Sequence, residues 1–412
     1  MSEGSPPLPV GAALARILAG VRAPLDPETV ALAQARGRTL AADLAARRTQ
    51  PPADVSAMDG YALRAADLAD IPATLTVVGM SSAGHRFDGA VGTGEAVRIF
   101  TGAPVPAGAD TVLIQENTRR EGDLVIALQG ERKGRHIRAA GLDFSQGEVL
   151  LETGRRMGAA ELALAAAMNH ATLAVTRAPR VALLATGDEL VKPGDNPGPD
   201  QIVASNSYAV AAYAEAAGAE VIDLGIAGDS YPALEASIRS ARTAKADVLV
   251  TLGGASVGDH DLVQSALARE GMELGFWRIA MRPGKPLMHG RLGDMHILGL
   301  PGNPVSAIVC AVLFLVPLVR ALCGDQQAGR DPSEAALLGA AVTPNDSRRD
   351  YLRGALASGG DGLPVATPFS QQDSSLLRVL AEGHCLIVRE SHSPAALAGD
   401  PCRIIRLGCN GF

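Results

Sequence analysis

The chain has 412 residues, which is enough for roughly two to four domains. Apolar residues make up 47% and charged residues 20%, a balance typical of folded globular proteins and not of disordered ones. The net charge of −7, without any dense run of Lys and Arg, excludes a nucleic-acid surface. An anionic ligand would therefore have to be held by a local cluster of cations.

The cysteines and the N-terminus indicate a cytoplasmic protein. The five cysteines form no CxxC pair, and no histidine lies at zinc-ligand spacing, so we expect reduced thiols. The first residues lack the cationic start of a secretory signal. The longest apolar stretch, residues 305–319, is interrupted by Ser306 and Pro317 and is shorter than the ~20 residues of a membrane span. We therefore expect no membrane segment.

The first part of the chain predicts a helical domain that is interrupted by an insert. Residues 10–48 are rich in helix formers and include Asp26-Pro27-Glu28 as a helix start, and residues 157–169 have the same character. Between them, short β-forming runs alternate with Gly and Pro turns, which predicts a mainly β insert. We expect a discontinuous helical domain at residues 1–49 and 148–178, and the insert at residues 50–147.

Residues 179–326 predict a doubly wound α/β domain, because apolar strand-like runs alternate with helix-like segments. This rhythm is typical of βαβ units, which form a central parallel sheet with helices on both faces. After a polar linker at residues 324–330, short strands separated by turns continue to the end of the chain. We expect residues 327–412 to form a small β-barrel, so that the whole chain is an α/β multidomain protein.

Two strand ends in the α/β domain have the features of an anion-binding site. One apolar run leads into Gly253-Gly254, and the next leads into Pro301-Gly302-Asn303-Pro304 at the head of a long apolar helix that contains Ser306. In open α/β sheets the ligand crevice lies beyond the carboxyl ends of the strands, where helix N-termini present free N–H groups. The paired glycines allow a phosphate to approach the backbone closely, and Pro304 suits a first helical turn.

A cationic segment lies between these two turns. It contains Arg278, Arg282 and Lys285, and the neighbouring residues 283–286 include two prolines and a glycine that restrict the backbone. Two glycine turns with cations between them predict a site for a large polyanionic ligand; solvated surface cations are the alternative. Ser256 has no His or Asp partner at interpretable spacing, so we expect it to bind an anion and not to act as a nucleophile.

Several carboxylates lie at the ends of apolar runs or beside glycines, namely Asp59, Asp143, Glu189, Asp229 and Asp261. Acids beside an anion site would repel the ligand unless a divalent cation stands between them. The two features together predict Mg²⁺ between carboxylate and phosphate, with Asp229 and Asp261 as metal ligands. The alternative is that each acid is a turn or cap residue. Thr101 adds a hydroxyl in a rigid Pro/Gly loop, where a turn cap is again the alternative.

Seven segments, in order along essentially the whole chain, resemble the MoeA family of molybdopterin molybdenumtransferases, which is related to the E domain of gephyrin. Each segment alone is moderately specific, and their shared order makes the resemblance close. The segments are Ser56–Ala62, Ile99–Asp110, Leu184–Val191, Ser205-Asn206, Gly253–Asp261, Met281–Pro286 and Leu300–Ser306.

The resemblance implies a homodimer of four-domain chains that takes adenylylated molybdopterin and molybdate and releases molybdenum cofactor and AMP with Mg²⁺. It also implies contact with the molybdopterin adenylyltransferase and with recipient molybdoenzymes. Arg353 and Ser374 or Ser375 resemble the family's oxyanion-binding positions, which in the family dimer lie near the partner chain's site. The residues carried over by motif are Asp59, Thr101, Asp143, Glu189, Asp229, Asp261, Arg282, Lys285, Pro301 and Pro304.

Two other functions fit parts of the pattern. The α/β domain with its glycine turns also resembles the domain that adenylylates molybdopterin from ATP. A gephyrin-like scaffold is a third hypothesis. The flanking domains with Asp59 and Thr101 favour metal insertion, because stand-alone adenylyltransferases of that kind lack them. The full set of acids and cations argues against a purely structural role, since scaffolding needs none of it.

Overall fold

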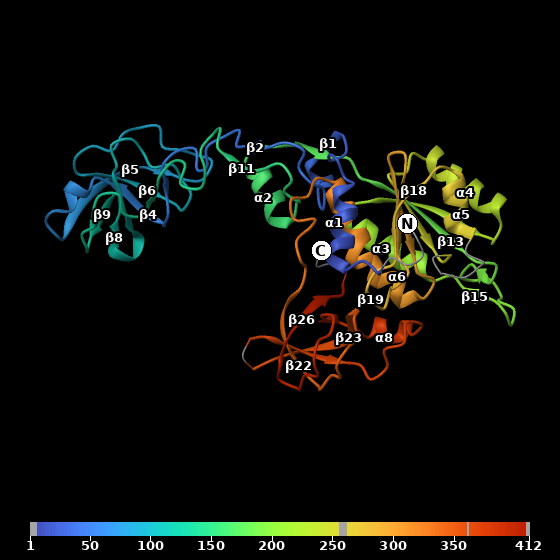
Figure 1. Ribbon diagram of the computed structural model, residues 1–412. Coiled ribbons are helices and arrows are strands. Elements are labelled where there is room, and N and C mark those ends of the chain that lie inside the picture. Colours follow the sequence, from blue (N-terminus) through green and yellow to red (C-terminus); the bar gives the residue numbers. More distant parts are fainter. Residues whose placement is uncertain (1–5, 255–261, 361, 409–412) are drawn as a thin grey trace.

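The computed structural model describes residues 6–254, 262–360 and 362–408, which form four regions (Figure 1). A β insert forms one end of the molecule, and a small region of paired strands connects it to the rest. The α/β domain and the C-terminal barrel lie together at the other end. The predicted multidomain α/β architecture is therefore confirmed.

The α/β domain is built on a six-stranded sheet in the order β16-β13-β17-β21-β20-β18. The first four strands are parallel, as predicted, whereas β20 runs in the opposite direction and pairs antiparallel with both β21 and β18. Gly293, with a φ of +63°, makes the tight turn between β20 and β21. The sheet is therefore mixed, a detail that the strand–helix rhythm did not predict. The strands are β13 (Arg180–Thr186), β16 (Glu220–Ala227), β17 (Val248–Leu252), β18 (Glu273–Trp277), β20 (Met288–Leu292) and β21 (Met295–Leu300).

Helices cover both faces of this sheet (Figure 1). Val181 and Val250 face the cluster that contains α1, α3, α6 and α7, whereas Ala182 and Leu249 face the cluster that contains α4 and α5. Alternate residues of each strand thus enter opposite layers of the core, as expected for a sheet that is buried on both sides. The helices are α1 (Val10–Ala19), α3 (Asn206–Ala217), α4 (Tyr231–Thr243), α5 (Leu262–Arg269), α6 (Pro304–Cys310) and α7 (Val316–Leu322).

The most apolar helix runs through the core of this domain. Helix α6, a π-helical turn (Ala311–Leu315) and α7 continue into one another over Pro304–Leu322, which is 19 residues with a mean hydropathy of 2.5. By length and composition alone this helix is able to cross a membrane, so the prediction that the stretch is too short is wrong. However, 83% of its most apolar window is buried inside the protein. A helix that is apolar all round and enclosed by protein is a core helix.

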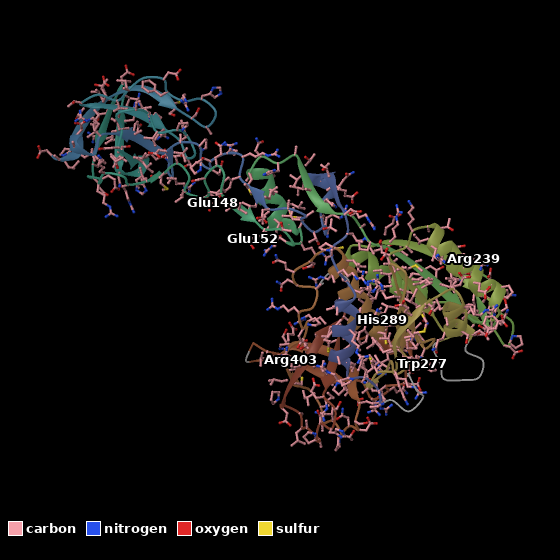
Figure 2. The ribbon with its side chains drawn as sticks, turned by 45° about the horizontal axis from the view of Figure 1, so that its top comes forward. Glu148, Glu152, Arg239, Trp277, His289 and Arg403 are labelled. Carbon is pink, nitrogen blue, oxygen red and sulfur yellow. The ribbon has the colours of Figure 1, made fainter. Side chains whose placement is uncertain are left out.

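Two histidines are buried at the antiparallel edge of the sheet, in the part of the α/β domain where Figure 2 labels His289. His289 and His296 are 5% and 1% exposed, and their ring centroids lie 5.8 Å apart. Burial, and next the charge of Arg291, lowers the pKa of His289 from 6.5 to about 4 and that of His296 to about 3. Both rings are therefore neutral in the folded protein at neutral pH.

We expect this pair to make the α/β domain sensitive to acid. A histidine whose pKa is lowered by folding contributes its full stability above pH 6.5 and loses that contribution as the pH falls towards its folded pKa, here about 4 or 3. The change reaches about 1.4 kcal/mol per pH unit for one group. His289→Leu should therefore flatten the pH dependence of the urea midpoint between pH 6.5 and 4. The exposed His85 provides the control, and an unchanged slope in the His289 variant would contradict this origin.

The predicted helix over residues 10–48 is correct only up to residue 19. The chain next forms two short strands, each of which pairs antiparallel with a strand that follows the insert. The second predicted helix, α2 (Ala159–Ala167), is confirmed. The pairs are β1 (Pro27–Ala31) with β12 (Thr172–Thr176), and β2 (Leu44–Ala45) with β11 (Val149–Leu151).

Tertiary contacts override the helix propensity of this Ala-rich stretch. Gly37 has a φ of +74°, which interrupts any helix. Leu40 and Leu44 lie in a separate small core with Phe144 and Met168, which are distant from them in the chain. Helix propensity is worth less than one kcal/mol per residue, so burial against residues distant in the chain decides the structure.

The insert contains a six-stranded sheet, which confirms its predicted β character. The strand order is β7-β4-β6-β5-β9-β8. Strands β4 and β7 pass so closely at Gly60 that a Cβ there would lie 2.0 Å from the carbonyl oxygen of Leu113. The strands are β4 (Gly60–Leu63), β5 (Ala73–Ser81), β6 (Glu95–Ile99), β7 (Thr111–Ile114), β8 (Thr118–Glu121) and β9 (Leu124–Ala127). A short ladder of β3 (Val55–Ser56) and β10 (Ile137–Arg138) lies beside the sheet.

Five strands at the C-terminus close into a small barrel, as predicted, because β23 pairs with both β24 and β25. Strand β19 (Met281–Arg282) comes from the α/β domain and pairs with the start of β23. Backbone hydrogen bonds therefore join the two domains. The barrel strands are β22 (Glu334–Leu338), β23 (Arg349–Ser358), β24 (Pro364–Pro368), β25 (Cys385–Arg389) and β26 (Pro401–Arg406), and the barrel also carries helix α8 (Leu377–Ala381).

Candidate functional site

A cavity of about 820 Å³ opens at the carboxyl ends of the four parallel strands. Residues within two positions after β13, β16, β17 and β21 all line it, so the end of each parallel strand leads into the wall. Parallel α/β sheets offer this position to ligands. The lining includes Glu189, Asp229, Gly253, Gly254, Pro301, Asn303, Pro304 and Ser375 from the predicted site.

Close packing requires the glycine turn after β17. Gly253 has a φ of +103°, and a Cβ there would lie 2.6 Å from the carbonyl oxygen of Thr186. Gly254 has a φ of +59°, and a Cβ there would meet the Val263 side chain at 2.2 Å. Only glycine suits both positions, so the turn presents bare backbone to the cavity. The predicted glycine turn therefore lies at the cavity, and phosphate binding by it stays a prediction.

The turn between β21 and α6 is held in place from two sides. Asn206, at the start of α3, donates through Nδ2 to the carbonyl oxygen of Gly302 at 2.7 Å. Asn303 donates through Nδ2 to Ser374 Oγ at 3.0 Å. Pro304 occupies the first turn of α6, as predicted, where its missing N–H has no cost. The start of α6 therefore has a fixed position beside the cavity.

Two of the predicted acids lie in this cavity. Glu189 and Asp229 are both exposed, and both line it. The backbone N–H of Asp229 donates to Asp188 Oδ1 at 2.9 Å, whereas no ion pair to the Asp229 carboxylate occurs among the described residues. Ser256 and Asp261 lie outside the described residues. The predicted pairing of Asp229 with Asp261 around a metal therefore stays a prediction.

A loop of the C-terminal barrel also reaches the cavity. Ser375 lines it, and the Ser375 hydroxyl donates to Asp373 Oδ1 at 2.7 Å. The N–H of Val305, in the first turn of α6, donates to the carbonyl oxygen of Ser374 at 3.0 Å. Ser375 therefore lies at the cavity of its own chain, and its expected role at the partner's site stays a prediction.

Arg353 and Ser306 are buried and do not line the cavity. Arg353 is 1% exposed on β23, and its Nη2 donates to the carbonyl oxygen of Asp373 at 3.2 Å. Burial lowers the pKa of this guanidinium. Ser306 is 4% exposed in the first turn of α6. Neither side chain is exposed at this cavity in the structure, and their predicted contact with the substrate stays a prediction.

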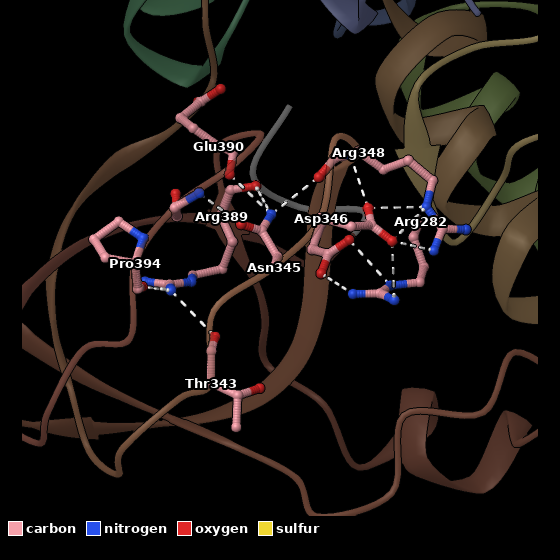
Figure 3. A network of polar contacts seen from close by, with 10 residues as sticks. Arg282, Thr343, Asn345, Asp346, Arg348, Arg389, Glu390 and Pro394 are labelled. Atoms are coloured by element: carbon pink, nitrogen blue, oxygen red, sulfur yellow. Dashed lines mark hydrogen bonds and ion pairs between the residues drawn. The ribbon is translucent and has the colours of Figure 1, made fainter.

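The three predicted cations lie beside the cavity and not in its wall, although Pro286 at the end of their segment lines it. Arg278 lies over the Trp277 ring, 5.3 Å from the centroid. Lys285 is exposed. Arg282 donates to Asp350 of the C-terminal barrel, and its Nη1 lies 3.9 Å from Asp346 (Figure 3).

Asp59 and Thr101 form a pair within the insert. Asp59 Oδ1 accepts hydrogen bonds from the backbone N–H of Thr101 at 2.7 Å and from the Thr101 hydroxyl at 2.8 Å. These bonds, the backbone one first, hold the pKa of Asp59 below its usual value. The pair therefore holds the Asp59 carboxylate in a fixed position. The same hydrogen bonds also fit the alternative interpretation, in which Asp59 and Thr101 only stabilise a turn.

Asp143 lies at a second cavity, of about 530 Å³, beside the insert. Arg48, Arg86 and Arg138 line the same cavity, as does Gly102, which follows Thr101. This second cavity is therefore lined by three arginines and the Asp143 carboxylate. The sequence motifs indicated Asp143 but not the three arginines, because these come from three separate segments.

The predicted residues therefore fall into two groups that a single chain does not bring together. Asp59, Thr101 and Asp143 belong to the insert end of the molecule, whereas Glu189 and Asp229 belong to the α/β domain (Figure 1). Both views show the insert separated from that domain by the connecting region. The two groups therefore do not form one site in the structure of the single chain.

Several cavity residues were not predicted as site residues. Strands β14 (Leu190–Val191) and β15 (Ile202–Val203) form a parallel ladder beside the cavity. The exposed Ile202 and Val203 give this part of the wall an apolar surface. Asn206 was visible only as part of a family motif, and a two-residue strand carries no periodic signal.

Comparison with known proteins agrees with this arrangement. Residues 8–169 match the MoeA N-terminal region (domain I and II), residues 182–321 match a probable molybdopterin binding domain, and residues 335–407 match the MoeA C-terminal region (domain IV). The molybdopterin molybdenumtransferase of Haemophilus influenzae is 35% identical over 382 residues, which cover 92% of this chain and 94% of that protein. The chain belongs to the MoeA family.

Further relatives agree with this membership. The Nostoc sp. molybdopterin molybdenumtransferase is 39% identical over 339 residues, covering 80% of this chain and 77% of that protein. The solved structure of the molybdopterin biosynthesis MoeA protein from Pyrococcus horikoshii OT3 has a TM-score of 0.85 at 25% identity and covers 98% of this chain and 100% of that one. The family resemblance predicted from the seven motifs is therefore confirmed.

Proposed function

We propose that this MoeA-family chain inserts molybdate into adenylylated molybdopterin and releases molybdenum cofactor and AMP. The observation that carries the proposal is the cavity at the four parallel strand ends, where two bare glycines, a helix start and two carboxylates meet. Backbone N–H groups and a helix start suit the phosphates of the substrate, and the volume suits a drug-sized organic ligand. Molybdate is itself an oxyanion, and the Ser375 hydroxyl could donate to it by exchanging its present hydrogen bond to Asp373 Oδ1.

The carboxylates of the cavity suit a magnesium ion. Among the described residues no group of three acids, histidines or cysteines is placed to hold a metal. Magnesium usually binds one or two carboxylates together with substrate phosphates, and Glu189 and Asp229 provide two, with Asp261 expected as a third. Bound there, the ion would neutralise phosphate charge and orient the AMP leaving group.

We propose a homodimer in which the site is completed by the insert of a second copy. The separation of Asp59 and Thr101 from the α/β cavity supports this arrangement. In this proposal the insert, and not the loop with Ser375, acts on the site of the other chain, because Ser375 lies at its own chain's cavity. The insert would supply the fixed Asp59 carboxylate and the Asp143 cavity with its arginines. Closed two-fold dimers are the commonest oligomers of soluble proteins.

Three further expectations follow from the family and remain proposals. The protein works in the cytoplasm and receives its substrate from the molybdopterin adenylyltransferase. It passes the product to molybdoenzymes, so we expect transient contacts with both. Adenylyltransfer from ATP is the runner-up activity, and the retained acids and glycines weigh against a purely scaffolding role.

Purified protein should release AMP from adenylylated molybdopterin only when molybdate is supplied together with Mg²⁺. The expected result follows from a polyanion site that contains acids, since those acids need a cation before the phosphates can approach. AMP would be measured by chromatography with and without molybdate and after chelation. The control replaces the substrate by ATP and free molybdopterin. Pyrophosphate release only in that control would favour adenylyltransfer instead, because transfer of the AMP group from ATP to molybdopterin leaves pyrophosphate and no free AMP.

A further inference from the structure

Asp350 of the C-terminal barrel binds Arg282 in the cationic segment that leads to the cavity. Strand β19 pairs with β23 so that Arg282 lies opposite Asp350. Arg282 Nε donates to Asp350 Oδ1 at 3.1 Å, and Arg282 Nη2 donates to Asp350 Oδ2. This two-point contact joins a cation of one domain to an anion of the other.

The two partners differ in burial. The Asp350 side chain is 4% exposed, whereas the Arg282 side chain is 49% exposed. A buried carboxylate that meets a planar guanidinium at two points fixes its orientation as well as its position. The Nη1 group of Arg282 lies 3.9 Å from Asp346, beyond hydrogen-bond distance, so this edge of the guanidinium keeps donors for another anion.

A second carboxylate stands nearby but is already engaged. Asp346 Oδ2 accepts from Arg348 Nη2 at 2.6 Å, and Asp346 Oδ1 accepts from the Arg348 backbone N–H at 2.9 Å (Figure 3). The Asp346 side chain is 48% exposed. Asn345 holds the same turn by donating to the carbonyl oxygens of Arg348 and Glu390 at 2.9 and 2.8 Å. Asp346 therefore belongs to a surface turn, and Asp350 is the buried contact.

The segment that contains Arg282 continues directly into the cavity wall. Four residues after Arg282, Pro286 lines the cavity, and the connection is short and tightly packed. A Cβ on Gly284 would lie 2.6 Å from Cys310 Sγ in helix α6, so the segment is wedged against the helix that starts at the site. Movement of Arg282 relative to the barrel would therefore shift both the guanidinium and the loop that ends at Pro286.

We propose that Asp350 is a positioning residue that holds the Arg282 guanidinium with one edge turned to the polyanionic substrate. The inference rests on the proposed function, and it adds a residue that does not itself contact the substrate. It also gives the C-terminal barrel a second role at the site besides carrying Ser375. Asp350 acts through Arg282, so its effect must disappear when the guanidinium is absent.

The test is a double-mutant cycle with Arg282→Ala and Asp350→Asn in the full-length protein. Asp350→Asn should raise the KM for adenylylated molybdopterin on the order of tenfold, as expected when a contact to a charged group is weakened, while kcat changes by less than about twofold. Combined with Arg282→Ala, it should have no further effect on KM. Asp346→Asn is the matched control and should change KM by less than about threefold, because half-exposed ion pairs contribute little.

Binding gives a readout that is independent of turnover. Trp277 is the only tryptophan of the chain and lies five residues before Arg282, so its fluorescence should report binding of adenylylated molybdopterin without molybdate. Arg282→Lys keeps the charge but loses the two-point contact, so it should match Asp350→Asn even if that variant folds poorly. Wild-type KM and affinity in Arg282→Lys, or equal effects of Asp350→Asn with and without Arg282, would overturn the inference. A wild-type protein that neither binds nor converts this substrate would instead refute the proposed function.

Discussion

Replacing Asp229 by asparagine is expected to lower molybdate-dependent AMP release on the order of 100-fold, the size of effect that loss of one charge-stabilising group has in an active site. Asp229 follows strand β16 at the cavity and is exposed. Its carboxylate has no ion pair within the described part of the chain, so the substitution removes no stabilising contact. The unfolding temperature should therefore stay within about 1 °C of the wild-type value, because surface substitutions of this kind are close to neutral.

Asp223 provides the matched control for this substitution. It lies on strand β16 itself, is also exposed, and does not line the cavity; its Oδ1 accepts from the Gly225 N–H at 2.8 Å. Asp223→Asn should change turnover by less than about twofold, as a surface substitution away from the site. If Asp229→Asn lowers the unfolding temperature in parallel with activity, Asp229 is a structural cap and not a ligand.

Mixing two inactive variants should restore activity if the site is shared between chains. Asp59→Ala disables the insert half, and Asp229→Asn disables the cavity half. After random subunit exchange at equal concentrations, half of the dimers contain one chain of each kind, and one of their two sites has both halves intact. About a quarter of all sites should therefore regain activity, an estimate that assumes a closed two-fold dimer. The measurement is AMP release before and after exchange.

The control mixture pairs two variants of the same half. Glu189→Gln and Asp229→Asn both change the α/β cavity, so every shared site in their mixture lacks one cavity carboxylate. No recovery is expected from this pair. Equal recovery in both mixtures would point to revertant or wild-type protein, and no recovery with Asp59→Ala despite proven exchange would place Asp59 outside the site of a second chain.

The α/β part of the fold was predictable because its signals are local. Apolar strand runs, helix-forming segments and glycine turns follow one another between residues 180 and 322, and each run corresponds to one element of the sheet or its covering layers. Strand β20 was not predicted because its sequence, Met288-His-Gly-Arg-Leu292, is not continuously apolar. Its place in the sheet depends on the turn at Gly293 and on pairing with β21.

The N-terminal region shows where sequence reasoning fails. Residues 31–46 have the composition of a helix, but the pairing of β1 with β12 joins segments separated by about 140 residues, and no local signal records it. The candidate site also divides into residues with a local sequence signal and residues placed by contacts between distant segments. The glycine turns and the acids after strand ends were predictable, because strand ends meet at one edge of a parallel sheet. The burial of Arg353 was not, because it depends on closure of the barrel.

The connecting region also bears on how the chain folds. Gln50 and Phe144 exchange hydrogen bonds, with the Gln50 N–H donating to Phe144 at 2.9 Å, so the chain leaves for the insert and returns from it at one point. Residues 51–143 therefore form a loop whose ends are held together by the small core beside it. Closing such a loop costs only about 0.6 kcal/mol more for each doubling of its length. Insertions or deletions within the insert should thus leave the assembly of the remaining domains almost unaffected, which gives evolution freedom to remodel one half of the site while the other is kept.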